Sequence, residues 1–155
     1  METTNKRLLS VDILRGLTII FMIIVNDPGS WSHVYAPLLH AEWNGVTPTD
    51  YIFPTFLFIV GVSIVLSLSS KVGNQNSKKS ILKKIFWRSL KIYLVGLFLW
   101  LWPNFDFDNI RWAGVLQRIS FVYLFCSLIF IYFNLRSQII LLISILVGYT
   151  IIMCF

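Results

Sequence analysis

The chain has 155 residues, of which 57% are hydrophobic and 13% are charged, and its mean hydropathy is +0.75. Soluble globular domains carry about 25% charged residues, so this composition excludes an ordinary soluble domain and indicates a protein of the lipid bilayer. The net charge of +6 is then a topology signal to be assigned loop by loop. A nucleic-acid partner is not expected, because the aromatic residues lie within or beside apolar runs and not among lysines.

Five apolar segments follow one another, and each is close to the roughly 17–25 residues that a transmembrane helix requires. They cover residues 8–25, 51–68, 85–101, 115–133 and 139–155. The runs are too long for membrane strands and lack strict alternation of polar and apolar residues. The sequence therefore predicts an all-α, polytopic integral membrane protein with five transmembrane helices. Because the chain stops within an apolar run, we expect a truncated coding sequence.

Basic side chains are distributed unevenly among the loops. They gather before the first segment, after the second and before the fifth: Lys6, Arg7, Lys71, Lys78, Lys79, Lys83, Lys84 and Arg136. The loop at residues 26–50 carries acidic residues but no Lys or Arg. The positive-inside rule then predicts a cytoplasmic N-terminus and an extracytoplasmic His40, in the cell (inner) membrane. The lysines after the second segment form a cluster. In the interpretation that we favour, this lysine cluster fixes the topology and contacts anionic lipid; in the alternative, it attracts a phosphorylated cofactor.

A stretch at residues 39–58 combines polar chemistry with the start of the second apolar segment. His40 lies close in sequence to Trp43, Asn44 and Asp50. An imidazole that titrates near neutral pH, placed at a membrane surface, is a candidate reaction centre. An ordinary extracytoplasmic loop is the alternative.

The same stretch contains a helix start. Thr47, Pro48 and Asp50 have the residue types of an N-cap, a first helical position and an acidic third position. We therefore expect Asp50 at the positive end of the second membrane helix, close to His40.

Further polar residues interrupt or flank the other segments. Asp12 and Arg15 are three residues apart, so they share a helix face and can pair; the alternative is that Arg15 snorkels to the cytoplasmic surface. Asn26 ends the first segment, where it either forms a turn or donates to an oxyanion near His40. Arg118 lies in the first turn of the fourth segment. Its three possible roles are a cation that binds substrate, a partner of Asp50 and an interface arginine.

Cys126 and Cys154 both fall inside apolar runs. They imply neither a disulfide nor a metal site, and no metal is expected.

Four stretches together resemble a known family. They are residues 7–16 (RLLSVDILRG), residues 22–26 (MIIVN), residues 40–45 (HAEWNG) with Asp50, Phe53 and Pro54, and residues 110–119 (IRWAGVLQRI). This set resembles the heparan-α-glucosaminide N-acetyltransferase family and its bacterial relatives, which are transmembrane acetyltransferases of amino sugars. Members of that family have about twice as many spans, so residues 1–155 match only the N-terminal part of the transmembrane acyltransferase domain.

The resemblance implies a function and a set of site residues. The donor would be acetyl-CoA on the cytoplasmic side, and the acceptor an amino sugar or glycan on the other side. The active histidine of the family corresponds to His40 and its essential asparagine to Asn26. Beyond the resemblance, we infer from the chemistry of the residues that Asp50 orients His40 or raises its basicity, and that Arg15 and Arg118 bind the acyl donor. Whether transfer is direct or passes through an acetyl-histidine stays open.

Two other functions remain as alternatives. A transporter or channel subunit would use Asp12, Arg15 and Arg118 to line a polar path. An inactive fragment would lack activity of its own. The expected partners are the lipid bilayer, acyl-CoA and the glycan acceptor, with a homodimer left open.

Overall fold

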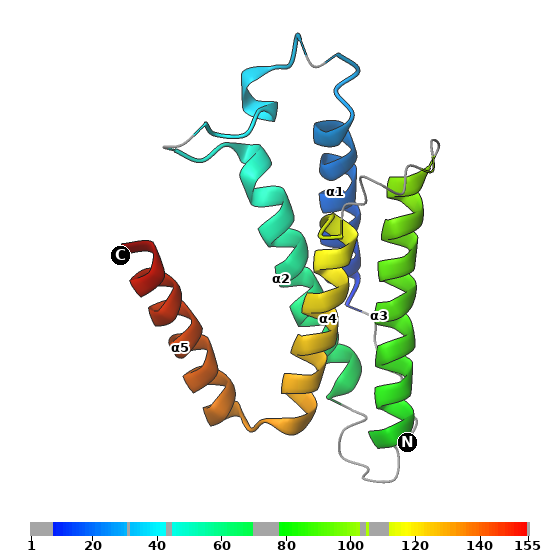
Figure 1. Cartoon of the computed structure of the whole chain (residues 1–155), viewed down its shortest axis with the longest axis vertical. Helices are drawn as coiled ribbons and strands as arrows, with labels where there is room; N and C mark the ends of the chain where they lie inside the picture. The colour runs from blue at the N-terminus through cyan, green and yellow to red at the C-terminus, as the bar shows by residue number, and fades with distance from the viewer. Residues whose placement is uncertain are drawn as a thin grey trace. The chain divides into compact units, whose positions relative to one another are not determined.

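The computed structural model describes residues 8–30, 32–42, 45–69, 78–102, 105 and 112–154. These residues form five α-helices and one short 3-10 helix, and the described part contains no strand (Figure 1). In chain order they are α1 (Leu9–Asn26), η1 (Ala36–Leu38), α2 (Pro48–Leu68), α3 (Lys78–Leu101), α4 (Val115–Tyr132) and α5 (Leu135–Cys154). The all-α class is therefore confirmed, with helices at all five predicted apolar segments.

Several residues named in the sequence analysis lie outside the described residues. They are Lys6, Arg7, Trp43, Asn44, Lys71, residues 110–111 and the last residue, Phe155.

Four of the helices are long and apolar enough to cross a membrane: α1, α2, α4 and α5. This supports a polytopic membrane protein. The remaining helix, α3, carries six basic residues within its first fourteen positions, which leaves an uninterrupted apolar run only from Ile92 to Leu101. The fifth predicted span, at residues 85–101, is therefore a helix, while its passage through the membrane stays a prediction.

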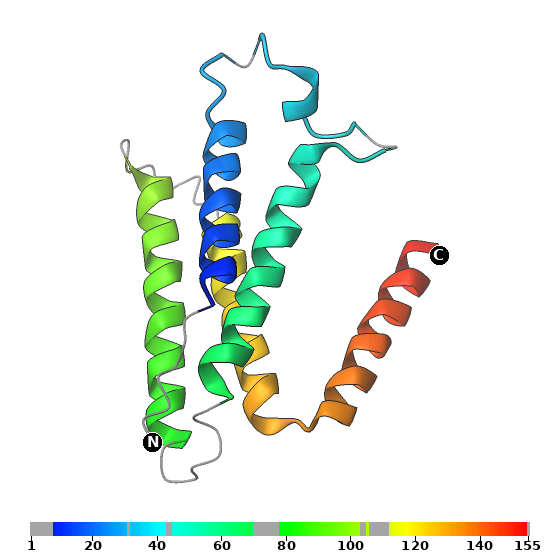
Figure 2. The ribbon, with the colours of Figure 1, turned by 180° about the vertical axis from the view of Figure 1, so that it is seen from behind.

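The chain divides into two compact units, Met1–Ser63 and Ile64–Phe155. The first unit contains α1, η1 and α2 as far as Ser63, and Figure 2 shows the loop that carries η1 joining one end of α1 to the start of α2. Arg15 of α1 donates a hydrogen bond to the hydroxyl of Ser63 in α2. The first unit therefore holds the His40 loop between two membrane helices that a polar contact ties together.

The second unit is built on the packing of α3 against α4. Gly96 permits the close approach, because a Cβ atom at this position would lie 2.8 Å from Cβ of Leu116. Ser89 and Ser120 are buried, and their hydroxyls lie 2.9 Å apart, each also donating to the other residue's carbonyl. Small residues and interhelical hydrogen bonds of this kind are the usual means of helix association in a membrane.

No residue of α5 is buried, although the helix is predominantly apolar after its first turn, which contains Arg136 and Gln138. A helix that is apolar on all sides is suited to lipid or to further membrane helices. Cys126 in α4 and Cys154 at the end of α5 are free thiols.

Candidate active site

His40 and Asp50 meet in the first unit. The imidazole Nδ1 of His40 lies 2.6 Å from Oδ1 of Asp50, which confirms that the residue expected near His40 does lie beside it. The His40 side chain is 72% exposed and that of Asp50 is 28% exposed. The pair therefore joins a fixed, half-buried carboxylate to an imidazole that is open to an incoming molecule.

The second carboxylate oxygen of Asp50 holds the start of α2. Oδ2 accepts the backbone N–H of Thr47 at 2.9 Å, the hydroxyl of Thr47 at 2.9 Å and the backbone N–H of Ala41 at 3.3 Å. The helix begins at Pro48, so Thr47 is the N-cap and Asp50 reaches back to the N-cap N–H as in a capping box. The predicted helix start is confirmed, and it orients the Asp50 carboxylate toward His40.

A second tie connects the loop that carries His40 to α2. Thr49 is only 4% exposed, and its hydroxyl donates to the backbone carbonyl of Pro37 at 3.1 Å. Pro37 belongs to η1, which ends two residues before His40. Because η1 and the Ala41 backbone are both bonded to the first turn of α2, His40 lies in a segment fixed on both sides.

The hydrogen bonds define what the imidazole can do. An ionised carboxylate is only an acceptor, so Nδ1 of His40 carries the proton that it donates to Asp50. In the neutral ring the other nitrogen, Nε2, then has a free lone pair. A histidine held in this tautomer by a carboxylate is suited to act as a general base or as a nucleophile.

Arg15 lies in a separate polar cluster between α1 and α2. Its guanidinium is 3.2 Å from Oδ1 of Asp12, which confirms the predicted pair, and it also donates to Ser63. Thr18 donates to the Arg15 carbonyl at 2.8 Å, and Ser63 donates to the carbonyl of Ile59 at 2.7 Å. The arginine is thus held by both helices of the first unit.

The other candidate residues have different surroundings. Asn26 is the last residue of α1 and is exposed, and its amide donates to the carbonyl of Met22 at 2.7 Å, which is local helix-end chemistry. Within the described residues it makes no hydrogen bond to His40. Arg118 lies in the first turn of α4, in the second unit, and is exposed. The catalytic role of Asn26 and the donor-binding role of Arg118 therefore stay predictions.

Sequence reasoning did not predict the contacts that three hydroxyl groups make in this region. They belong to Thr47, which donates to Asp50, to Thr49, which holds η1, and to Ser63, which accepts from Arg15. Only Thr47 carried a usable signal, because an N-cap threonine three residues before an acid predicts bonding between the two. No group of His, Cys, Asp and Glu side chains suited to a metal ion occurs within the described part of the chain.

The fold and the site together define a polytopic helical membrane protein with an accessible histidine–carboxylate pair at the start of a membrane helix. Residues 7–154 match the family model for heparan-alpha-glucosaminide N-acetyltransferase, catalytic. The chain belongs to this family.

Two curated relatives carry the name heparan-alpha-glucosaminide N-acetyltransferase. The mouse protein (Mus musculus) is 37% identical over 137 residues, which cover 85% of this chain and 20% of the relative. The human protein (Homo sapiens) is 39% identical over 128 residues, which cover 79% of this chain and 19% of the relative. The chain thus spans about one fifth of the length of these relatives.

Proposed function

We propose that this chain forms part of a membrane-embedded acetyltransferase that moves an acetyl group from cytoplasmic acetyl-CoA to an extracytoplasmic amino sugar or glycan. Membership of the acetyltransferase family supports the reaction class. The single observation that supports His40 as the reaction centre is the bond between its Nδ1 and Asp50, because Nε2 of this exposed imidazole then has no partner among the described residues.

In the direct route, His40 acts as a general base. The acceptor amine attacks the thioester carbonyl carbon while Nε2 takes a proton from the amine nitrogen. The carbon–sulfur bond breaks, CoA leaves as a thiolate, and the proton on Nε2 passes to that sulfur. Asp50 stabilises the imidazolium that forms between these steps, because a carboxylate at 2.6 Å makes a charge-assisted hydrogen bond to Nδ1–H.

In the two-step route, Nε2 of His40 attacks the thioester carbonyl itself. An acetyl-imidazole forms, the carbon–sulfur bond breaks and CoA leaves as a thiolate. The acceptor amine then attacks the acetyl carbon, the bond to Nε2 breaks, and one proton passes from the amine to the thiolate. The same tautomer serves both routes, since each begins with a lone pair on Nε2.

The other site residues have supporting roles in this proposal. Asn26 donates to the oxyanion that develops on the thioester carbonyl through the second N–H of its amide, since one N–H is bonded to the Met22 carbonyl. Arg15 contributes a cation to the donor channel about 16 Å below Asn26 along α1. Arg118 contributes a second cation to donor binding. The N-terminus is cytoplasmic and the His40 loop is extracytoplasmic in this arrangement, as the distribution of basic residues favours.

A pair of histidine variants tests the proposal. The chain is reconstituted in vesicles with acetyl-CoA labelled in the acetyl group and glucosamine as acceptor, and labelled product is counted. His40→Ala should abolish transfer, whereas His33→Ala should leave it unchanged. His33 is a matched control because it is an exposed histidine of the same loop, and its side chain is bonded only to Ser32 within the described residues. Transfer retained in His40→Ala would remove His40 as the reacting group.

The same reaction without acceptor separates the two routes. Label that stays on the protein after rapid separation, and is lost in His40→Ala, indicates an acetyl-histidine. If the protein is active in the complete reaction but carries no label when the acceptor is left out, transfer is direct. The corresponding histidine substitution in a full-length member of the family gives the same comparison with the rest of the protein present.

A further inference from the structure

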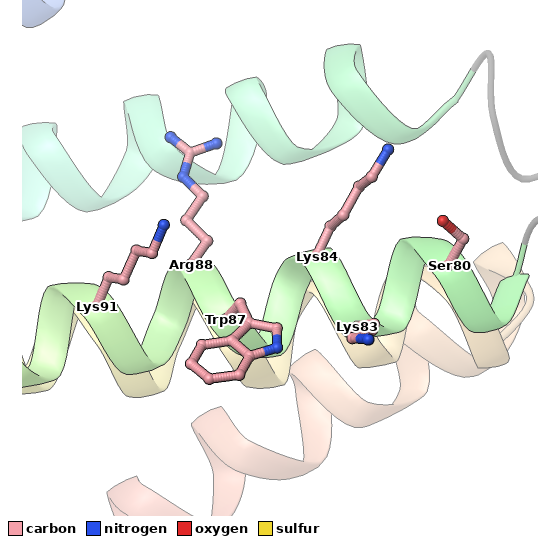
Figure 3. A pocket seen from close by; sticks show the side chains of 6 residues that line it. All are labelled: Ser80, Lys83, Lys84, Trp87, Arg88 and Lys91. Atoms are coloured by element: carbon pink, nitrogen blue, oxygen red, sulfur yellow. The ribbon is translucent and has the colours of Figure 1, made fainter.

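One face of α3 carries a stripe of cations in the second unit. Lys83, Lys84, Arg88 and Lys91, with Ser80 and Trp87, line a groove of about 400 Å³ (Figure 3). Steps of three and four residues place these side chains on neighbouring turns of one helix face. We call these six residues the basic stripe. Lys83 and Lys91 are about 12 Å apart along the helix axis, which is the scale of a lipid headgroup and not of a long polymer.

Packing against α4 fixes the direction in which the basic stripe points. Ile81, Ile85 and Ser89 are buried on the other side of α3, and Ser89 is bonded to Ser120 of α4. The Arg88 guanidinium is 5.1 Å from the ring centroid of Tyr123, an attractive cation–π distance. The basic stripe therefore lies beside the contact between α3 and α4, and Tyr123 of α4 holds Arg88 at the edge of that contact.

The described residues of the second unit supply no counter-charge to the basic stripe. These residues, 64–69, 78–102, 105 and 112–154, contain no Asp or Glu. Four cations gathered on one face repel one another, and an anion from outside the unit relieves this repulsion. A phosphate group is well matched, because lysine and arginine both form strong charge-assisted hydrogen bonds with phosphate oxygens.

The same face continues as an apolar surface. Leu94, Val95 and Phe98 follow Lys91 at helical spacing, and each is 53% exposed. Trp87 lies among the cations and is 51% exposed, which suits an indole at a membrane–water interface. One helix face is thus cationic in its first half and apolar in its second half. A molecule with an anionic head and an apolar tail matches both halves of this face.

We propose that the basic stripe binds the headgroup phosphate of an anionic phospholipid, whose acyl chains run along Leu94, Val95 and Phe98. Lys84, Arg88 and Lys91 bind the phosphate, and Trp87 packs against the glycerol region. This site is separate from the acetyl transfer proposed above and does not depend on it. Cations within a membrane-spanning helix carry a desolvation cost. A bound anionic headgroup would lower this cost for the cations of α3.

Native mass spectrometry of the full 155-residue chain in a neutral detergent tests the site. The chain is titrated with phosphatidylglycerol, and with phosphatidylcholine as the zwitterionic reference. The native chain should bind phosphatidylglycerol at least about tenfold more tightly, and the preference should fall with added salt. The triple variant Lys84→Gln, Arg88→Gln, Lys91→Gln should lose the preference. A native chain that binds both lipids equally would overturn the proposal.

Two control variants separate a local site from net charge and from misfolding. Lys78→Gln, Lys79→Gln, Arg136→Gln removes the same charge outside the basic stripe and should keep the preference; an equal loss would show only general attraction and overturn the site. Lys84→Arg, Arg88→Lys, Lys91→Arg keeps every charge and should bind as the native chain does. Loss of the preference in this charge-conserving variant, with helical circular dichroism intact, would also contradict the proposal.

Free coenzyme A distinguishes a lipid phosphate from a soluble one. Excess coenzyme A, which has phosphates but no acyl chains, should leave bound phosphatidylglycerol in place. The control is the variant Lys84→Gln, Arg88→Gln, Lys91→Gln at the same coenzyme A concentration. If coenzyme A displaces phosphatidylglycerol from the native chain but does not change lipid binding to this variant, the basic stripe binds a soluble phosphate compound, and the lipid assignment is overturned.

Discussion

The imidazole of His40 and the carboxylate of Asp50 are ten residues apart in sequence and 2.6 Å apart in space. One oxygen of this carboxylate faces the imidazole, while the other caps α2 through Thr47. The start of a membrane helix and the orientation of the candidate base are therefore set by the same side chain. A substitution at either residue tests how far the two roles can be separated.

Asp50→Asn is expected to lower acetyl transfer by about a hundredfold or more, the usual range for losing a positioned acid–base group. The asparagine amide can present an N–H to Nδ1, which favours the tautomer whose proton sits on Nε2 and removes the lone pair that the reaction needs. Turnover of labelled acetyl-CoA measures the loss. Nitrogen-15 NMR of the imidazole should show the change of tautomer in the same variant.

Asp27→Asn is the matched control for this prediction. Asp27 is an exposed carboxylate that follows α1, and its side chain forms no hydrogen bond or ion pair within the described residues. Its variant should transfer acetyl groups at the native rate. Equal losses in the two variants would mean that negative charge near the loop matters, and not the bond from Asp50 to His40.

Thr47→Ala is expected to weaken the start of α2 by about 1 kcal/mol, the usual contribution of an N-cap hydroxyl. The hydroxyl that donates to Asp50 is lost, whereas the backbone N–H of Thr47 still reaches the same oxygen. Amide hydrogen exchange at residues 47–52 should become faster. Thr47→Ser keeps the hydroxyl and should exchange at the native rate; exchange as fast as in Thr47→Ala would show that the methyl group, and not the hydrogen bond, is responsible.

Arg15→Gln is expected to raise the KM for acetyl-CoA by about tenfold, the effect of losing one interaction of about 1.4 kcal/mol with an anionic substrate. Ser63→Ala is the informative comparison, since it removes the partner on α2 and leaves the cation in place. Its KM should stay within about twofold of the native value. If both variants raise KM equally, Arg15 acts by holding α1 to α2 and does not contact the donor.

Local sequence signals predicted the parts of the site that depend on short separations. Thr47, Pro48 and Asp50 gave the helix start because capping is a matter of three or four residues. The pairing of Asp12 with Arg15 followed from helix geometry alone.

Contacts between distant residues were not predictable in the same way. Ser63 meets Arg15 across 48 positions, and Ser89 meets Ser120 across 31, and many serines in the apolar segments are equally suitable partners. Hydropathy also predicted a span from residue 85, whereas α3 begins at Lys78 and places four of its six basic residues along one face. Composition averaged over a window does not show on which side of a helix the charges lie.

Gly96→Ala is expected to destabilise the second unit by about 1–3 kcal/mol, the usual range for overpacking a tight contact. Its Cβ would lie 2.8 Å from Cβ of Leu116 and 3.0 Å from Oε1 of Gln117, so α3 and α4 would have to separate. Gly148→Ala is the control, because a Cβ at that helical position meets nothing within 4 Å and alanine favours a helix by up to about 1 kcal/mol. Unfolding in mixed detergent micelles should give a lower midpoint for Gly96→Ala and an unchanged or higher one for Gly148→Ala. Equal midpoints would show that α3 and α4 do not approach as closely as the glycine requires.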